Sequence, residues 1–162
     1  MRPTACLVMD DVLMTMSAQR SVGGHAMLTA MMYVYDVVLL TRDPDIERRE
    51  AWLYQNGIGG HAALFAIDQG PFSKGHDITY FANRLRHAYK YPIELFVVGN
   101  PEEAAALFDA GYMVTLFMHP SYTRPEWRPN ANKKITPWGD ISEFMATEAA
   151  LAAADERTKE EH

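Results

Sequence analysis

Two adjacent carboxylates, Asp10 and Asp11, follow directly on an apolar run at residues 5–9, and Thr41 and Asp68 also follow apolar runs. If these runs are parallel strands, their carboxyl ends share one edge of a sheet, where α/β proteins bind ligands. Carboxylates gathered there could hold Mg²⁺, which prefers oxygen ligands. Asp10, Asp11 and Asp68 are therefore candidate magnesium ligands. The alternative interpretation is that Asp10 and Asp11 only end a strand and cap the next turn.

Short apolar runs supply the strands that must position these groups. Each run has mostly apolar residues without strict alternation, which is typical of strands covered on both faces. The runs are residues 5–9, 37–40, 62–67, 95–98 and 113–117. Because helix-like segments separate them, the sequence predicts an α/β fold with a doubly wound, Rossmann-like, parallel five-stranded sheet.

Two of the intervening segments carry helix start signals. Asp43 is a candidate N-cap with Pro44 at the first helical position, and Asn100 with Pro101 repeats the arrangement. A third segment, residues 76–88, spaces its apolar side chains so that they share one helical face. These signals predict helices between the second and third strands, the third and fourth, and the fourth and fifth.

The sequence changes character after residue 118, so we expect a single domain whose α/β core spans residues 1–118. A proline-rich loop is predicted at 119–139, and an alanine-rich C-terminal helix at 140–162. Aromatic and basic side chains in this loop are candidate partner-binding residues, although they could also serve only to anchor and solvate it. They are Tyr122, Arg124, Trp127, Arg128 and Trp138.

Composition limits the classes of function. The net charge of −6 argues against nucleic-acid binding, because that binding needs a cationic face. The single cysteine excludes an intrachain disulfide, and the histidines show no metal-ligand spacing. No apolar stretch approaches the roughly 20 residues of a membrane span, and no secretory signal is apparent. The sequence predicts a soluble cytoplasmic protein that needs no cofactor unless it is a magnesium enzyme.

The order of these elements resembles the haloacid dehalogenase (HAD) superfamily of phosphohydrolases. The segment VVLLTRDPDIERREAWLYQNGI, residues 37–58, is similar to the second-strand signature of that family, and it carries Thr41. The resemblance implies that Thr41 hydrogen-bonds a phosphate oxygen. It is closest to small members without a cap domain, including bacteriophage-encoded HAD-like proteins, and it extends loosely to the proline-rich segment.

Several catalytic positions implied by this resemblance are altered. Aligning VMDDVL with the first-strand motif places Asp10 at the general acid/base and Val8 at the nucleophile, and valine cannot form a phosphoenzyme. The magnesium-binding acids of the fourth strand are replaced by Gly99 and Asn100. The position of the phosphate-binding lysine in the family is held by Tyr80, and Lys74 is the nearest substitute.

With these positions altered, the resemblance implies a catalytically degenerate HAD-like protein, and the likeness to phage-encoded members implies a bacteriophage protein. We expect it to act by binding other proteins, as a virion or interaction component or through self-association, in the host cytoplasm or the particle. On this interpretation, Asp10→Asn should have little effect on folding. The alternative is a Mg²⁺-dependent phosphohydrolase of nucleotides or nucleic-acid ends. It would bind Mg²⁺ through Asp10, Asp11 and Asp68, and phosphate through Thr41 and Lys74. A nucleotide-binding regulator that uses Thr41 is a third hypothesis.

Overall fold

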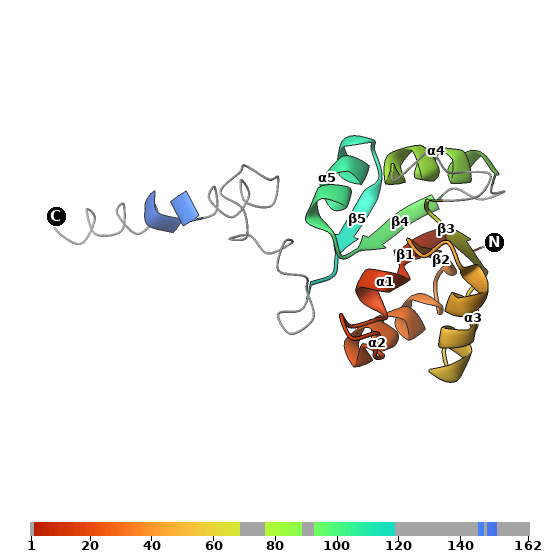
Figure 1. The fold of residues 1–162 in the computed structure, drawn as a ribbon. Coiled ribbons are helices and arrows are strands. Elements are labelled where there is room, and N and C mark those ends of the chain that lie inside the picture. The colour runs from red at the N-terminus through yellow and green to blue at the C-terminus, as the bar shows by residue number, and fades with distance from the viewer. Residues whose placement is uncertain (1, 69–76, 89–92, 119–145, 148, 152–162) are drawn as a thin grey trace, which may run out of the picture.

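The computed structural model describes residues 2–68, 77–88, 93–118, 146–147 and 149–151 (Figure 1). Within them, five parallel strands form one sheet in the order β3-β2-β1-β4-β5. The strands are β1 (Thr4–Val8), β2 (Asp36–Thr41), β3 (Ala63–Ala66), β4 (Ile93–Val98) and β5 (Met113–Leu116). This arrangement confirms the α/β class and the Rossmann-like parallel sheet.

Helices cover both faces of the sheet, as Figure 1 shows. They are α1 (Met9–Val12), α2 (Val22–Met31), α3 (Ile46–Gln55), α4 (Ile78–Ala88) and α5 (Pro101–Asp109). Side chains of α1, α2 and α3 pack in one core cluster with Leu7 of β1. Side chains of α4 and α5 pack in the other, with Cys6 and Val8. Because successive side chains of a strand face opposite ways, β1 contributes to both clusters.

Of the two predicted helix N-caps, Asn100 is confirmed and Asp43 is wrong. Asn100 is the N-cap of α5, since its side chain accepts a hydrogen bond of 2.9 Å from the Glu102 amide, and Pro101 is the first helical residue. The prediction for Asp43 was wrong. Asp45 caps α3 by accepting from the Arg48 amide at 3.0 Å, while Asp43 lies before the helix. The two caps differ because the turn after β2 is longer than the turn after β4.

The C-terminal predictions fall mostly outside the described residues. The proline-rich loop and its candidate partner-binding residues are all outside them. Of the predicted helix at 140–162, residues 146–147 and 149–151 are described, and these are helical. Among the residues that the structure describes, no helix is long and apolar enough to cross a bilayer.

The helix α2 is an element that the sequence patterns did not predict. It begins with the sequence VGG, and glycine weakens helix propensity. Its N-cap is Ser21, whose hydroxyl oxygen accepts a hydrogen bond of 3.1 Å from the Gly24 amide. Gly24 is buried, and a Cβ atom there would lie 1.7 Å from the carbonyl oxygen of Val12. The glycine is therefore needed because α2 packs against the backbone at the end of α1.

Gly24→Ala should lower the free energy of unfolding by about 2 kcal/mol, because α2 must shift to accommodate the new methyl group. Urea denaturation measures this change. Gly59→Ala is the matched control, since a Cβ atom at Gly59 would have no heavy atom within 4 Å. The control should change stability by less than about 0.5 kcal/mol. Equal effects of the two substitutions would show that the close contact between α2 and α1 does not exist.

Candidate functional site

The carboxyl edge of the sheet brings together residues that are distant in the sequence. Asp10 and Asp11 lie on the single helical turn α1 that follows β1, rather than on a strand end. Thr41 is the last residue of β2, and Arg42 follows it. Glu103 joins them from the first turn of α5, after β4. Strands β2, β1 and β4 are adjacent in the sheet, so their following segments meet at this edge.

Asp10 has its carboxylate held by donors from the segment after β2. The Thr41 hydroxyl lies 2.9 Å from Oδ1 and 3.0 Å from Oδ2 of Asp10. The backbone amide of Arg42 donates to Oδ2 at 2.6 Å, and Arg49 Nη2 forms an ion pair with Oδ1 at 3.3 Å. The Asp10 side chain is only 8% exposed. Its carboxylate therefore already occupies the point to which the Thr41 hydroxyl and the Arg42 amide donate.

Asp11 is bound in a fork by the guanidinium of Arg42. Both contacts, Nη1 to Oδ1 and Nη2 to Oδ2, measure 2.9 Å, and the Asp11 side chain is 1% exposed. Arg42 also reaches Glu103, with Nη2 at 2.6 Å from Oε2 and Nε at 3.2 Å from Oε1. One partly buried cation thus joins two carboxylates from α1 and α5. Such paired geometry is favourable for arginine and carboxylate.

The ionisation of this triad follows from burial and charge. Burial alone would lower the pKa of Arg42, but the charges and hydrogen bonds of Asp11 and Glu103 outweigh it and raise the pKa. The pKa of Glu103 is raised, mainly by burial and to a smaller extent by the charges of Asp11 and Asp68, although Arg42 opposes the shift. The charge of Asp68, which follows β3, thus reaches Glu103, whereas its predicted role as a magnesium ligand stays a prediction. Arg42 remains a permanent cation between the two carboxylates.

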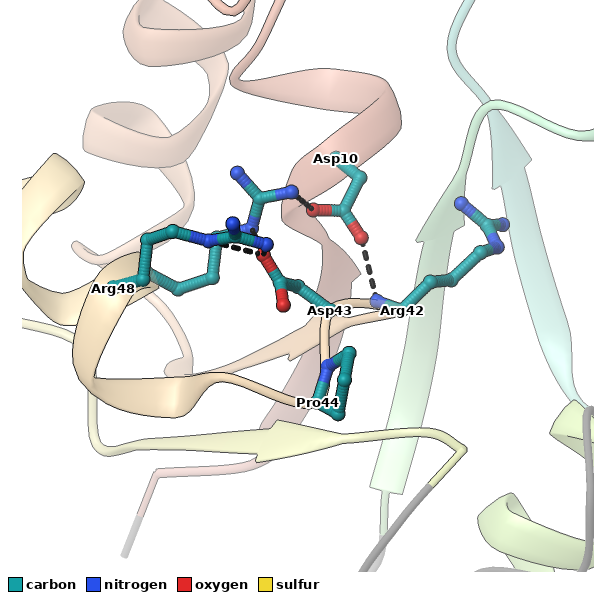
Figure 2. Close-up of a pocket in the computed structure, with 6 residues that line it drawn as sticks. Asp10, Arg42, Asp43, Pro44 and Arg48 are labelled. Atoms are coloured by element: carbon teal, nitrogen blue, oxygen red, sulfur yellow. Dashed lines mark hydrogen bonds and ion pairs between the residues drawn. The ribbon is translucent and has the colours of Figure 1, made fainter.

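A pocket of about 290 Å³ opens beside Asp10. Its lining residues are Asp10, Arg42, Asp43, Pro44, Arg48 and Arg49. Figure 2 shows the carboxylates of Asp10 and Asp43 facing arginine side chains of α3, while the Arg42 side chain extends away from them. Every acid of the pocket is thus paired with an arginine.

Asp43 is buried in the turn before α3. It accepts from the Asp45 amide at 2.9 Å, contacts Arg48 Nη2, and lies 3.4 Å from Arg49 Nε. Burial acts to raise the pKa of Asp43, but these hydrogen bonds and charges outweigh burial and leave the pKa below its usual 3.8. A depressed acid pKa stabilises the folded state above the unfolded-state value, and this stabilisation disappears as the pH falls through the folded-state value.

Asp43→Asn should therefore cost about 1 kcal/mol of stability at neutral pH, and nothing at a pH well below 3.8. Urea denaturation of both proteins over a pH series measures the difference. Asp109→Asn, at an exposed position of α5, is the control and should show no such dependence. A difference between wild type and Asp43→Asn that stays constant down to pH ~2 would contradict the assignment.

The two positions where the resemblance expects magnesium-binding acids hold Gly99 and Asn100, and Gly99 has no room for a side chain. A Cβ atom at Gly99 would lie 2.5 Å from Cβ of Asp11 and 3.3 Å from the carbonyl oxygen of Phe117. The side chain of Asn100 is occupied in capping α5. Over the described part of the chain, no three His, Cys, Asp or Glu side chains are grouped so that they could hold a metal ion.

Sequence reasoning identified only some of the residues in this site. Asp10, Asp11 and Thr41 do meet, whereas Lys74 lies outside the described residues. Arg42 and Glu103 were missed, together with the arginines of α3. Arg42 follows the end of a predicted strand and Glu103 lies in the first turn of a predicted helix, so their positions at the edge were foreseeable. Their pairing was not, because it depends on the strand order.

No protein-family model matches the chain, and no curated protein matches its sequence.

Proposed function

We propose that this chain is a degenerate HAD-like protein of a bacteriophage, without phosphoryl-transfer activity, that acts by binding as a virion or interaction component. The observation that carries the loss of activity is the position of Arg42 between Asp11 and Glu103. The phage origin and the binding role rest on the sequence resemblance. The Rossmann-like sheet is compatible with both, although a fold alone does not fix a function.

Phosphoryl transfer through an aspartyl intermediate needs a carboxylate oxygen that can reach phosphorus, and a cation that neutralises the developing charge. Both oxygens of Asp11 accept from Arg42, and the side chain is almost completely buried. Both oxygens of Asp10 accept from Thr41, and Oδ2 also accepts from the Arg42 amide. Neither carboxylate is free to attack a substrate without breaking several charge-assisted hydrogen bonds. Each of these is worth about 1.5–3 kcal/mol.

The charge of Arg42 also takes the place that a metal ion would need. The guanidinium of an arginine stays protonated in a protein. It can donate hydrogen bonds to a phosphate oxygen, but it cannot coordinate that oxygen directly as a metal ion does. It can stabilise the two carboxylates, but it cannot activate water or bridge a nucleophile and a phosphoryl group as Mg²⁺ does. Arg42 can therefore neutralise the carboxylates of this site, but it cannot supply the phosphoryl-transfer chemistry that Mg²⁺ supplies in a phosphatase.

An assay of phosphate release tests the loss of activity. The purified protein is incubated with Mg²⁺ and either p-nitrophenyl phosphate or oligonucleotides phosphorylated at one end. We expect the release rate to equal that of buffer, with Asp10→Asn and the surface control Asp109→Asn indistinguishable from wild type. Release that requires Mg²⁺ and that Asp10→Asn abolishes, while Asp109→Asn retains it, would overturn this part of the proposal.

The binding role needs its own experiment. Quantitative mass spectrometry of purified particles of the encoding phage should find the chain at a fixed copy number relative to the major capsid protein. A non-structural protein of the same phage provides the background level. If the chain occurs only at that background, and is also absent from any complex in infected cells, the binding role is wrong.

One observation favours the alternative function, a Mg²⁺-dependent phosphohydrolase of nucleotides or nucleic-acid ends. The Thr41 hydroxyl and the Arg42 amide donate to a single point beside a pocket lined by arginines, which is an arrangement that suits an oxyanion. In the structure the carboxylate of Asp10 fills this point. The phosphate-release assay decides between the two functions.

A further inference from the structure

A short hairpin of residues 13–21 connects α1 to α2, and we call it the 13–21 hairpin. At its base the Ser21 amide donates to Leu13 O at 2.8 Å. Residues 16–20 at its tip are exposed and belong to neither core cluster. The position of the tip therefore depends on a few polar contacts rather than on burial.

The tip contains a strained residue, Ala18. Its φ of 59° lies in the left-handed region, and no other residue except glycine has a positive φ in the described part of the chain. A residue with a Cβ atom is disfavoured in this region, whereas glycine is not. Such a residue keeps its conformation only where surrounding contacts enforce it. One of these contacts is local, since the Ala18 amide donates to Thr15 O at 3.0 Å.

The second contact that holds Ala18 comes from α3. The indole Nε1 of Trp52 donates to the carbonyl oxygen of Ala18 at 2.8 Å, across 34 positions in sequence. The indole ring is partly buried and packs against the core cluster of α1, α2 and α3, so the donor is fixed in place. The strained tip is thus held against α3 by a side chain that packs against the core.

The helix α3 holds the same segment of the chain at another point. Arg49 lies three residues before Trp52, on the same side of α3, and its Nη2 pairs with Oδ1 of Asp10 at 3.3 Å. Asp10 belongs to α1, and the Leu13 amide extends that helical turn into the hairpin by donating to Met9 O at 2.9 Å. The turn α1 has four residues and no side-chain N-cap. It therefore forms one continuous segment with the hairpin, and α3 contacts this segment twice.

We propose that the 13–21 hairpin is a conformational switch with a closed state, in which Trp52 holds it against α3, and an open state. Opening weakens the ion pair between Asp10 and Arg49, so the exposed tip controls the pocket that these two residues line. By linkage, loss of the ion pair makes the hairpin open more often. Release of the strain at Ala18 favours the open state. This goes beyond the function proposed above, since the result of the phosphate-release assay does not depend on it.

Hydrogen exchange of the amides of Thr15 and Ala18, followed by NMR, measures how often the hairpin opens. Trp52→Phe keeps an aromatic ring in the core but removes the donor, and it should speed exchange of both amides by about fivefold to tenfold, which corresponds to the loss of one hydrogen bond. Tyr54→Phe, at an 87% exposed aromatic position of α3, is the matched control and should leave the rates within about twofold. The Leu7 amide, in β1, serves as the reference for global stability.

Ala18→Gly separates the strain at the tip from the packing of Trp52. It keeps the carbonyl oxygen and removes the Cβ atom that disfavours the left-handed conformation. The closed state is therefore favoured, and exchange of the Thr15 amide should slow by about twofold or more. A loss of packing cannot produce this result, because the substitution removes only an exposed methyl group.

A double-mutant cycle tests the coupling to Asp10. Asp10→Asn weakens the ion pair with Arg49, so it should speed exchange of the Ala18 amide about threefold in the wild type and by less than about 1.5-fold in Trp52→Phe. Asp109→Asn is the control and should have no effect in either background. Unchanged exchange in Trp52→Phe, faster exchange in Ala18→Gly, or an effect of Asp10→Asn that is absent or equal in both backgrounds would each overturn the proposal.

Discussion

Replacing Arg42 by methionine should lower the free energy of unfolding by about 3 kcal/mol, the lower end of the usual cost of breaking a buried ion pair, because Asp11 is buried whereas Arg42 and Glu103 are partly exposed. Asp11 would keep its 1% exposure, and Glu103 its position in the first turn of α5, without the cation that now joins them. Methionine fills much of the same volume, so the loss comes from the uncompensated carboxylates rather than from a cavity. Urea denaturation at pH 7 measures the effect.

The pH dependence of this variant distinguishes an electrostatic cause from a packing cause. A buried and a partly buried carboxylate without a cation favour protonation in the folded state, so Arg42→Met should recover stability relative to wild type as the pH falls toward ~5. Arg86→Met, at an exposed position of α4, is the control and should change stability by less than about 0.5 kcal/mol at every pH. If Arg42→Met resembles this control, Arg42 does not neutralise the crevice.

Asp10→Ala should lower the free energy of unfolding by about 3 kcal/mol, because it removes the acceptor of the Thr41 hydroxyl, the Arg42 amide and the Arg49 guanidinium. The sequence alone led to a different expectation for Asp10→Asn, namely little effect on folding. The contacts explain the revision, since Asp10 connects α1 to the segment between β2 and α3. Thermal unfolding of wild type and variant measures the change.

Inorganic phosphate should partly restore Asp10→Ala, since the donors that held the carboxylate can hold another oxyanion in its place. A recovery of about 1 kcal/mol corresponds to a rise in Tm of about 2–4 °C. Wild type and the control Asp109→Ala should show no such rise above that produced by chloride at equal ionic strength. A variant as stable as wild type, or one stabilised equally by phosphate and chloride, would contradict the role assigned to Asp10.

The candidate site was only partly predictable. Carboxylates after the first strand and a threonine after the second were visible as residue types at strand ends, and the structure brings them together. The sequence did not show which cation these carboxylates contact. The hypotheses of a magnesium site and of a degenerate site differ in that cation. That cation is Arg42, which pairs with Glu103 across 61 positions in sequence. No local pattern indicates a contact of this kind.

The amino-acid sequence by itself determined the α/β class, the parallel sheet and the cap of α5. These depend on the continuity of apolar runs and on residues one or two positions apart, which local physics controls. Tertiary structure decided the strand order, the packing of Gly24 against α1, and the pairing of Asp10, Asp11, Asp43 and Glu103 with arginines. Such features depend on which distant backbone segments lie side by side, and the chain acquires that information only when the sheet has formed.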